Sequence, residues 1–219
     1  MKATKIKTLL KSSEINQSCV VKGWVKTFRA NRFIALNDGS SLKNLQCVVD
    51  FENLEESLLK RITTGAAVHL EGKLVESQGG RQKIELQVQK LEVLGDSDPE
   101  NYPIQPKKHS LEFLREKAHL RVRTTTFAAV MRIRSRLSFA VHNFFQEQGF
   151  YYINTPIITG SDAEGAGEMF RVSTLDAKNP PLNEAGNPDY KQDFFGKETN
   201  LTVSGQLEAE TYALGLGEV

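Results

Sequence analysis

The sequence lacks long apolar runs, a secretory leader and more than two cysteines, and each absence argues against a class of protein. No apolar run approaches the roughly 20 residues that a membrane-spanning helix needs, so no membrane is expected among the partners. Residues 1–5 are not followed by an apolar stretch with a small-residue cleavage site, which argues against secretion. Cys19 and Cys47 lie in apolar, strand-like runs, and free thiols in a reducing cytoplasm are favoured over a disulfide. Without a histidine cluster, two cysteines are also too few for a metal site.

The 219 residues that are present have the composition of a globular protein and suffice for two modest domains, or for one domain and part of another. The net charge of +1 conceals an uneven distribution. Counted as Lys and Arg minus Asp and Glu, the charge is +3 for residues 1–98, +6 for 99–136 and −8 for 137–219. A polyanion is therefore expected to prefer the first two segments, while the acidic third segment is equally explained by solvated loops.

Residues 18–94 show the pattern of a small β-barrel. Five runs are predicted as strands, at residues 18–28, 32–36, 45–51, 66–75 and 82–94. A short helix is predicted between the third and fourth runs, at residues 52–61. Three strands, a helix and two strands is the order of the five-stranded OB barrel, although other all-β folds remain open.

The remainder of the chain mixes helical and strand patterns, so the fold class is α+β. Prolines and acidic residues indicate a linker at 95–110. A long helix is expected to begin at a capping Thr125 or Thr126 and to end at Gly149. The other predicted elements are a basic, partly helical segment (111–123), a short strand (150–153), a long irregular insertion (176–198), a strand (201–203) and a helix (206–214).

The first hairpin of the predicted barrel carries cations and aromatic rings together. The cations are Lys22, Lys26, Arg29, Arg32 and Lys43, and the rings are Trp24, Phe28 and Phe33. Cations suit phosphates and flat rings suit unstacked bases, so this mixture is typical of a surface for single-stranded nucleic acid. Any half-buried sheet can show the same mixture, and for Trp24 a place in the core is the favoured interpretation.

Two segments of the second half could bind a small ligand. Residues 161–168 form a glycine-rich acidic loop in which the carboxylate of Glu164 suits an ammonium group, although a solvated loop remains the alternative. Ser204 and Gln206 lie between a predicted strand and a predicted helix, where ligand contacts are common. The GxxxxGK[ST] pattern is absent, which excludes a phosphate-cradling loop of that type.

Several segments, in this order, resemble the class II aminoacyl-tRNA synthetases of the aspartyl, asparaginyl and lysyl subgroup. The segments that resemble the OB anticodon-binding domain are residues 23–25, 33–38 and 45–50. Residues 120–124 with the following helix, and residues 150–156, resemble class II motif 1. Residues 164–170 and 201–210 resemble the asparaginyl members in particular. The resemblance covers roughly residues 16–219.

This resemblance implies three parts and an activity. The parts are an OB-fold anticodon-binding domain (1–98), a linker or hinge (99–123), and the start of a class II catalytic domain with a mixed, mainly antiparallel sheet (124–219). The asparaginyl members ligate asparagine to tRNA(Asn) with ATP through an asparaginyl-adenylate, in the cytoplasm and as a homodimer. Motif 1 forms the dimer interface, and Pro156 marks its end.

The resemblance also assigns roles in tRNA binding. The phenylalanine that matches Phe33 stacks on the middle anticodon uridine, and the glutamine that matches Gln46 hydrogen-bonds to it. Arg29 is expected to hold the anticodon backbone or the first base. These roles fit the residue types, because a ring provides stacking and an amide offers the donor and acceptor that a uracil edge needs.

A second set of roles concerns the amino acid. Glu164 matches the carboxylate that binds the α-ammonium group, and Gln206, beside Ser204, matches a second polar contact to the same end. The aspartyl enzymes carry a lysine where Ala209 stands, so the cation that pairs with a substrate carboxylate is missing here. Glu210 can accept a hydrogen bond from a side-chain amide, which favours asparagine and disfavours aspartate.

Class II motifs 2 and 3, which hold ATP and Mg2+ in the family, are absent from the 219 residues. Most ATP and Mg2+ ligands are therefore expected beyond Val219, and no catalytic residue or metal ligand is assigned in the chain. The sequence is interpreted as an N-terminal fragment that is inactive alone. Three alternatives stay open, namely a stand-alone nucleic-acid-binding OB protein, a truncated synthetase paralogue, and an aspartyl enzyme of relaxed tRNA choice.

Overall fold

The computed structural model describes residues 2–50, 52, 54–79, 82–163, 165 and 168–219. The chain forms two compact units, residues 1–135 and 136–219. The boundary between them falls within the long helix α4 (Thr125–Glu147). The first unit therefore contains the barrel, the linker and the beginning of α4.

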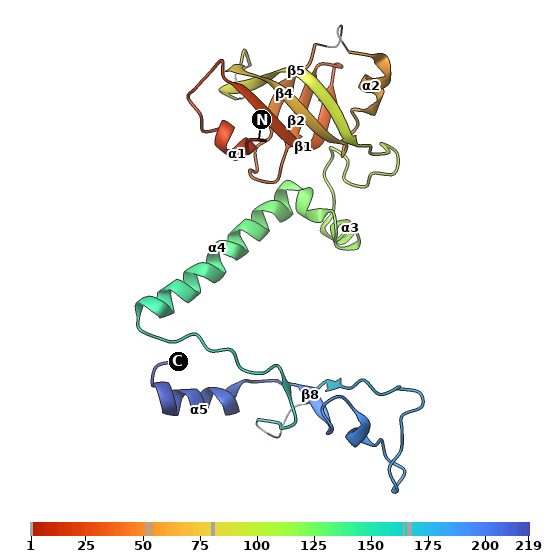
Figure 1. Ribbon diagram of the computed structural model, residues 1–219, viewed down its shortest axis with the longest axis vertical. Coiled ribbons are helices and arrows are strands. Elements are labelled where there is room, and N and C mark those ends of the chain that lie inside the picture. The colour runs from red at the N-terminus through yellow and green to blue at the C-terminus, as the bar shows by residue number, and fades with distance from the viewer. Residues whose placement is uncertain (1, 51, 53, 80–81, 164, 166–167) are drawn as a thin grey trace. The chain divides into compact units, whose positions relative to one another are not determined.

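Five strands of the first unit close into a barrel in the order β1-β2-β3-β5-β4 (Figure 1), which confirms the predicted OB barrel. The strands are β1 (Ser18–Arg29), β2 (Phe33–Asn37), β3 (Leu45–Val48), β4 (Ala67–Glu76) and β5 (Ile84–Gly95). The pair β3 and β5 is parallel, and the other neighbouring pairs are antiparallel. The predicted helix between the third and fourth strands is α2 (Glu56–Arg61).

Alternate residues of the strands fill the barrel interior. On β2 and β3 the buried apolar residues are Ile34, Leu36, Leu45 and Cys47, and the residues between them face outward. A short helix that the sequence analysis missed, α1 (Ile6–Leu9), adds Ile6 and Leu9 to the same core. Both cysteines are free and buried, and burial raises the pKa of the Cys47 thiol. Removal of this apolar surface from water is the main force that holds the barrel together.

Two turns give the β1-β2-β3 meander its register. Ala30 and Asn31 have φ angles of 51° and 49°, as the two central residues of a type I′ hairpin turn do. After β2, the Asn37 side chain accepts a hydrogen bond from the Gly39 amide at 2.8 Å, and Asp38 accepts one from the Ser40 amide at 2.9 Å. Such local side-chain bonds stabilise turns, and here they hold the turn at residues 37–40.

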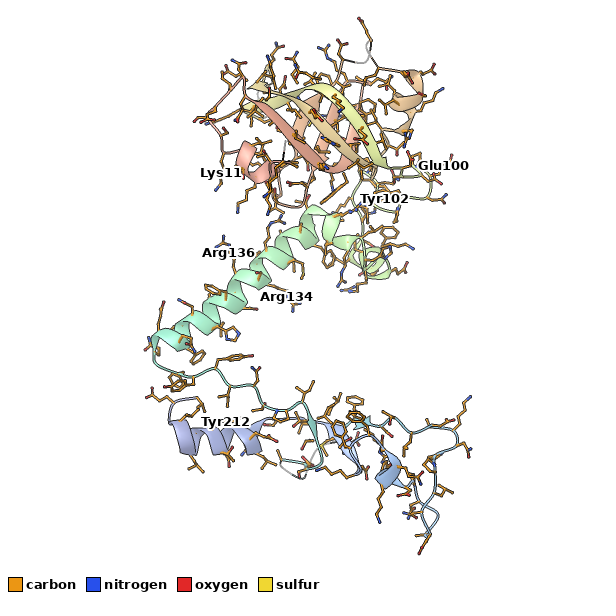
Figure 2. All side chains as sticks on the ribbon, in the orientation of Figure 1. Lys11, Glu100, Tyr102, Arg134, Arg136 and Tyr212 are labelled. Atoms are coloured by element: carbon orange, nitrogen blue, oxygen red, sulfur yellow. The ribbon has the colours of Figure 1, made fainter. Side chains whose placement is uncertain are left out.

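The linker packs against the barrel within the first unit. It contains α3 (Leu111–Glu116) and a short 3-10 helix (Arg121–Arg123). The Arg123 guanidinium donates to the hydroxyl of Tyr102 (labelled in Figure 2) at 3.2 Å, and it lies 4.9 Å from the centre of the Trp24 ring. The ammonium group of Lys26 donates to the Arg123 carbonyl at 2.8 Å. Side chains of β1 thereby fix the entry to α4.

The long helix α4 already includes Thr125 as its first residue. The residue that caps it is therefore Thr124, and not Thr125 or Thr126 as predicted. Thr124 has an extended backbone, and its hydroxyl accepts a hydrogen bond from the Phe127 amide at 3.3 Å. The predicted end of the helix is confirmed, because Gly149 has a φ of 92°, which glycine adopts without strain. Among the described helices, none combines the length and apolarity needed to cross a bilayer.

The second unit contains a small antiparallel sheet and a helix. The strands β6 (Ile158–Thr159), β7 (Arg171–Val172) and β8 (Thr199–Leu201) are ordered β6-β8-β7, and α5 (Gln206–Leu216) follows. The strand predicted at residues 150–153 is wrong: the Phe150 and Tyr151 amides donate to the carbonyls of Phe145 and Glu218, so no ladder forms there. The strand predicted at 201–203 lies two residues earlier, because its ladder with β6 and β7 spans Thr199–Leu201.

The insertion at residues 176–198 is mostly irregular, as predicted, but it is held by one carboxylate. Asp193 accepts hydrogen bonds from the Ser173 hydroxyl at 2.6 Å, the Thr174 hydroxyl at 2.7 Å and the Thr174 amide at 2.9 Å. These donors hold the pKa of the Asp193 carboxyl well below its usual range. The end of the insertion is thereby tied to the segment that follows β7.

Candidate functional site

The barrel register aligns a row of outward-facing residues across all five strands of the barrel. Arg29 pairs with Phe33, Phe33 with Val48, Val48 with Gln87, and Gln87 with Lys73. None of the five belongs to the buried core, and their neighbours along each strand point inward. The row therefore forms a continuous surface with a cation at each end and a ring and an amide between them.

Phe33 lies half-buried in this row rather than in the core. The guanidinium carbon of Arg32 lies 5.8 Å from the centre of its ring. A ring at the surface with a cation beside it can stack on a base and attract the adjoining phosphate. Any half-buried sheet can carry such a ring, but the outward position of Phe33 satisfies the geometric requirement for stacking.

Gln46 lies on the same outer face, one pleat along β3 from Val48. Its backbone amide donates to the Gln82 side chain at 3.3 Å, and its side-chain amide donates to the carboxylate of Glu85 at 3.0 Å. The structure thus brings together Arg29, Phe33 and Gln46, the three residues predicted for the anticodon.

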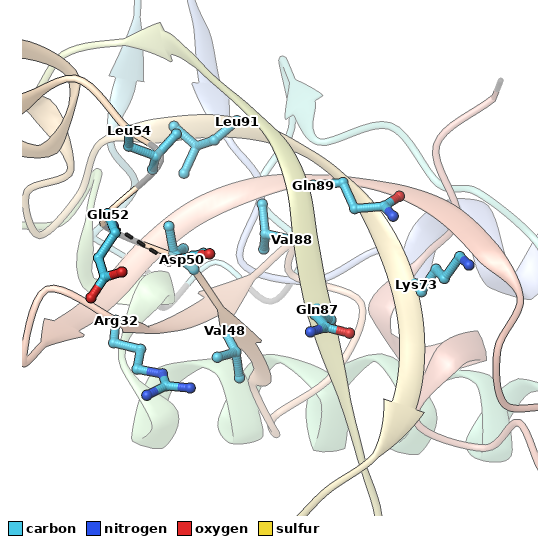
Figure 3. Close-up of a pocket in the computed structure, with 11 residues that line it drawn as sticks. Arg32, Val48, Asp50, Glu52, Leu54, Lys73, Gln87, Val88, Gln89 and Leu91 are labelled. Atoms are coloured by element: carbon cyan, nitrogen blue, oxygen red, sulfur yellow. Dashed lines mark hydrogen bonds between the residues drawn. The ribbon is translucent and has the colours of Figure 1, made fainter.

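A groove of about 710 Å3 continues the row (Figure 3). Its polar lining includes the cations Arg32 and Lys73 and the amides of Gln87 and Gln89. Asp50 and Glu52 also line the groove, and the Glu52 amide donates to the Asp50 carboxylate at 3.4 Å. A groove that offers both cations and amides can accept a sugar–phosphate segment together with a polar base edge.

Other residues proposed from the first hairpin lie elsewhere. Trp24 is half-buried beneath Arg123, and Phe28 packs against the barrel core. Lys26 is engaged with the linker, and burial together with the nearby Arg123 lowers the pKa of its ammonium group. Trp24, Phe28 and Lys26 therefore have structural roles in this unit, and they are not part of the outward row.

The sequence analysis missed the contribution of β5 to this face. Glu85 and Gln87 alternate with the buried Ile84 and Leu86. This alternation is visible in the sequence, but nothing in it indicates that β5 lies beside β3. The parallel pairing of β3 and β5 brings residues about 40 positions apart into contact.

In the second unit, three of the four residues predicted for the amino acid lie together at the start of α5. The Ser204 hydroxyl accepts from the Gln206 amide at 3.1 Å, and the Gln206 side chain donates to the Glu210 carboxylate at 2.9 Å. Gly205 has no room for a side chain, because a Cβ there would lie 2.2 Å from the Thr155 hydroxyl. The fourth residue, Glu164, lies outside the described residues.

The segment before this cluster carries the predicted interface residue. Pro156 is exposed, and it follows the Thr155 that contacts Gly205. Several apolar side chains of the second half of α4 are also exposed, among them Leu137, Phe139 and Phe144. Among the described residues, no group of three or more His, Cys, Asp or Glu could hold a metal ion.

Two families match the chain in the order that these features suggest. Residues 19–94 match the OB-fold nucleic acid binding domain, and residues 110–208 match the class II tRNA synthetases (D, K and N). The asparagine–tRNA ligase of Cytophaga hutchinsonii is 58% identical over the whole chain, and the chain covers 48% of that protein. That of Acetivibrio thermocellus is 51% identical, with the same 48% covered. The chain thus spans about half the length of these relatives.

Solved structures share the fold. The crystal structure of asparaginyl-tRNA synthetase from Pyrococcus horikoshii complexed with asparaginyl-adenylate matches 99% of this chain with a TM-score of 0.77 and 22% identity, and 46% of that chain is covered. The asparaginyl-tRNA synthetase from Entamoeba histolytica matches with a TM-score of 0.74 and 22% identity, over 99% of this chain and 46% of its own.

A closed five-stranded barrel followed by part of a class II catalytic domain gives the chain the architecture of a class II tRNA synthetase of the D, K and N group. Within this class, asparagine–tRNA ligases that are more than 50% identical to the chain match it over its whole length. Over its whole length the chain is similar to asparaginyl-tRNA synthetases, of which it spans about half.

Proposed function

We propose that the barrel binds the anticodon loop of tRNA(Asn), in a cytoplasmic protein that ligates asparagine to that tRNA with ATP. The observation that carries the proposal is the outward row of the barrel, where Phe33 lies between Arg29 and Val48 with Gln46 on the same face. Stacking, hydrogen bonding and phosphate attraction, the three interactions that single-stranded RNA needs, are available at one surface.

The roles proposed within the barrel are those that the resemblance implies, and they suit the chemistry of the residues. The Phe33 ring stacks on the middle anticodon uridine, and the Gln46 amide bonds to its edge. Arg29 neutralises the backbone or contacts the first base, because an exposed guanidinium offers several donors to phosphate or to a base edge. The groove beyond Val48 accommodates a flanking nucleotide.

The second unit contributes part of the asparagine pocket. Glu210 accepts from the side-chain amide of asparagine, and Ala209 leaves out the cation that an aspartate would need. Gln206, held by Ser204 and Glu210, faces the α-amino end together with Glu164. The exposed apolar side chains of α4 and the exposed Pro156 support a homodimer interface in the same protein.

ATP, with Mg2+, is the co-substrate of this proposed reaction. The described residues offer no cluster of metal ligands, and the chain lacks the motif 2 arginine that binds ATP in the family. Most ATP and Mg2+ ligands are expected beyond Val219, as the resemblance implies, and no catalytic step is assigned to the described residues.

Binding of an RNA hairpin with a GUU anticodon loop tests the proposal. Arg29, Arg32 and Lys73 supply three cations near the row, and each phosphate contact on a single strand contributes about −0.7 to the slope of log affinity against log salt. A slope of about −2 is expected, which corresponds to a roughly 20-fold loss of affinity between 50 and 200 mM salt.

Lys73→Gln should bring the slope closer to zero by about 0.7. The matched control is Lys60→Gln, since Lys60 lies on α2 in an exposed ion pair with Glu56 at 2.8 Å. Fluorescence anisotropy with a labelled hairpin at several salt concentrations gives both slopes. An equal change in the two variants, or no binding by the chain, contradicts the proposed surface.

A further inference from the structure

Gln46 does not stand alone on the outer face of the barrel. Because Cys47 pairs with Leu86 and Val48 with Gln87 in the parallel β3–β5 ladder, Gln46 and Glu85 lie side by side. The Gln46 side-chain nitrogen donates to Oε2 of Glu85 at 3.0 Å. The Ser77 hydroxyl, at the end of β4, donates to the same oxygen at 3.0 Å.

This contact determines which way the Gln46 amide points. An ionised carboxylate only accepts hydrogen bonds, so the atom of Gln46 that faces Glu85 must be the NH2 nitrogen. One hydrogen of that group is used, and the other remains available. Among the described residues, no donor bonds to the Gln46 carbonyl oxygen. The side chain thus presents one donor and one acceptor in a fixed order.

That order distinguishes the two pyrimidines. The pairing edge of uracil offers an acceptor at O4 and a donor at N3, which match an amide hydrogen and an amide oxygen. The same edge of cytosine offers a donor at N4 and an acceptor at N3, so it matches the amide only after a flip of 180°. A free glutamine can adopt both orientations and can therefore bind either base.

We propose that Glu85 is a positioning residue that locks the Gln46 amide in the orientation that reads uridine and rejects cytidine. Ser77 holds the Glu85 carboxylate in place through its hydrogen bond. The inference rests on the proposed function, because it requires a pyrimidine of the anticodon loop at this face. It adds to the proposed function a physical reason why the barrel would prefer uridine to cytidine, two bases of equal size.

The test compares two RNA hairpins that differ only by U or C at the middle anticodon position. The 219-residue chain is expected to prefer the U hairpin by about 5- to 150-fold, the range for a bidentate contact to a base. Glu85→Gln replaces an acceptor with a group that both accepts and donates, so the Gln46 amide can flip. The preference should then fall to within about twofold, chiefly through tighter binding of the C hairpin.

Glu85→Ala is the second variant, since it removes the constraint without adding a donor, and it should also abolish the preference. Gln46→Ala should lose the preference as well, and adding Glu85→Gln to it should change the ratio no further. Circular dichroism melting identifies which of the two Glu85 variants are folded. One folded Glu85 variant is enough for the comparison of the two hairpins.

The outcomes separate the inference from the function on which it rests. If the unmodified chain prefers U and the Glu85 variants do not, the positioning role is supported. If the variants keep the U preference, or lose affinity for both hairpins equally, Glu85 is only structural and the inference is overturned while the proposed function stands. If the unmodified chain binds neither hairpin, the proposed function fails and the inference fails with it.

Discussion

Replacing Glu210 by glutamine is expected to lower kcat/KM for asparagine by about 10- to 150-fold in a full-length asparagine–tRNA ligase that contains this sequence. The Glu210 carboxylate already accepts from the Gln206 amide at 2.9 Å, and a carboxylate has further lone pairs for a second donor. A hydrogen bond to a charged group contributes about 1.5–3 kcal/mol, and the neutral amide of glutamine would retain the shape without the charge.

The matched control for this substitution is Glu208→Gln, on the same helix but on a different face. Asparagine-dependent pyrophosphate exchange measures kcat/KM for both variants, and the control should stay within about threefold of the unmodified enzyme. Should Glu210→Gln also stay within about threefold, a change below 1 kcal/mol, Glu210 would be a solvated helix residue and not part of the pocket.

Phe33→Ala is expected to weaken binding of the GUU hairpin by about 5- to 150-fold, because stacking of one base on an aromatic ring contributes roughly 1–3 kcal/mol. The barrel should remain folded, since Phe33 faces outward while the adjacent Ile34 fills the core. Affinity measured at constant salt isolates the loss of stacking from the electrostatic contribution.

Two further substitutions separate stacking from apolar packing at this position. Phe33→Trp retains an aromatic face and should bind within about threefold of the unmodified chain. Phe33→Leu retains apolar bulk without a ring and should weaken binding nearly as much as alanine does. If Phe33→Ala binds the hairpin as tightly as the unmodified chain, the ring is a bystander.

The elements that sequence could predict are those with local causes. The five barrel strands follow from residue pattern and turn chemistry, and the end of α4 follows from the conformational freedom of Gly149. The strand expected at residues 150–153 failed because a strand requires a partner, and these amides bond to α4 and to Glu218 instead. The cap of α4, predicted at Thr125 or Thr126, was misplaced by one or two residues because three consecutive threonines offer equivalent hydroxyls.

In the candidate sites too, contacts between residues close in sequence could be predicted, and contacts between distant residues could not. Gln206 and Glu210 are four residues apart on one helix, so their contact follows from helix geometry. The contact between Gln46 and Glu85 joins residues 39 positions apart, and it depends on a parallel strand pair that residue patterns do not specify. The structural role of Lys26 could not be predicted for the same reason. Its partner is the carbonyl of Arg123, which is distant in sequence.

The outward face of β2 is proposed to hold the middle anticodon base against Phe33, and photo-crosslinking tests this contact most directly. A GUU hairpin with 5-iodouridine at the middle position would be irradiated with the 219-residue chain, digested with trypsin and analysed by mass spectrometry. The crosslink should map to the peptide 33–43, which follows Arg32 and ends at Lys43, and within it to Phe33. A crosslink to the Trp24 peptide 23–26 or to peptides of α4 would contradict the account.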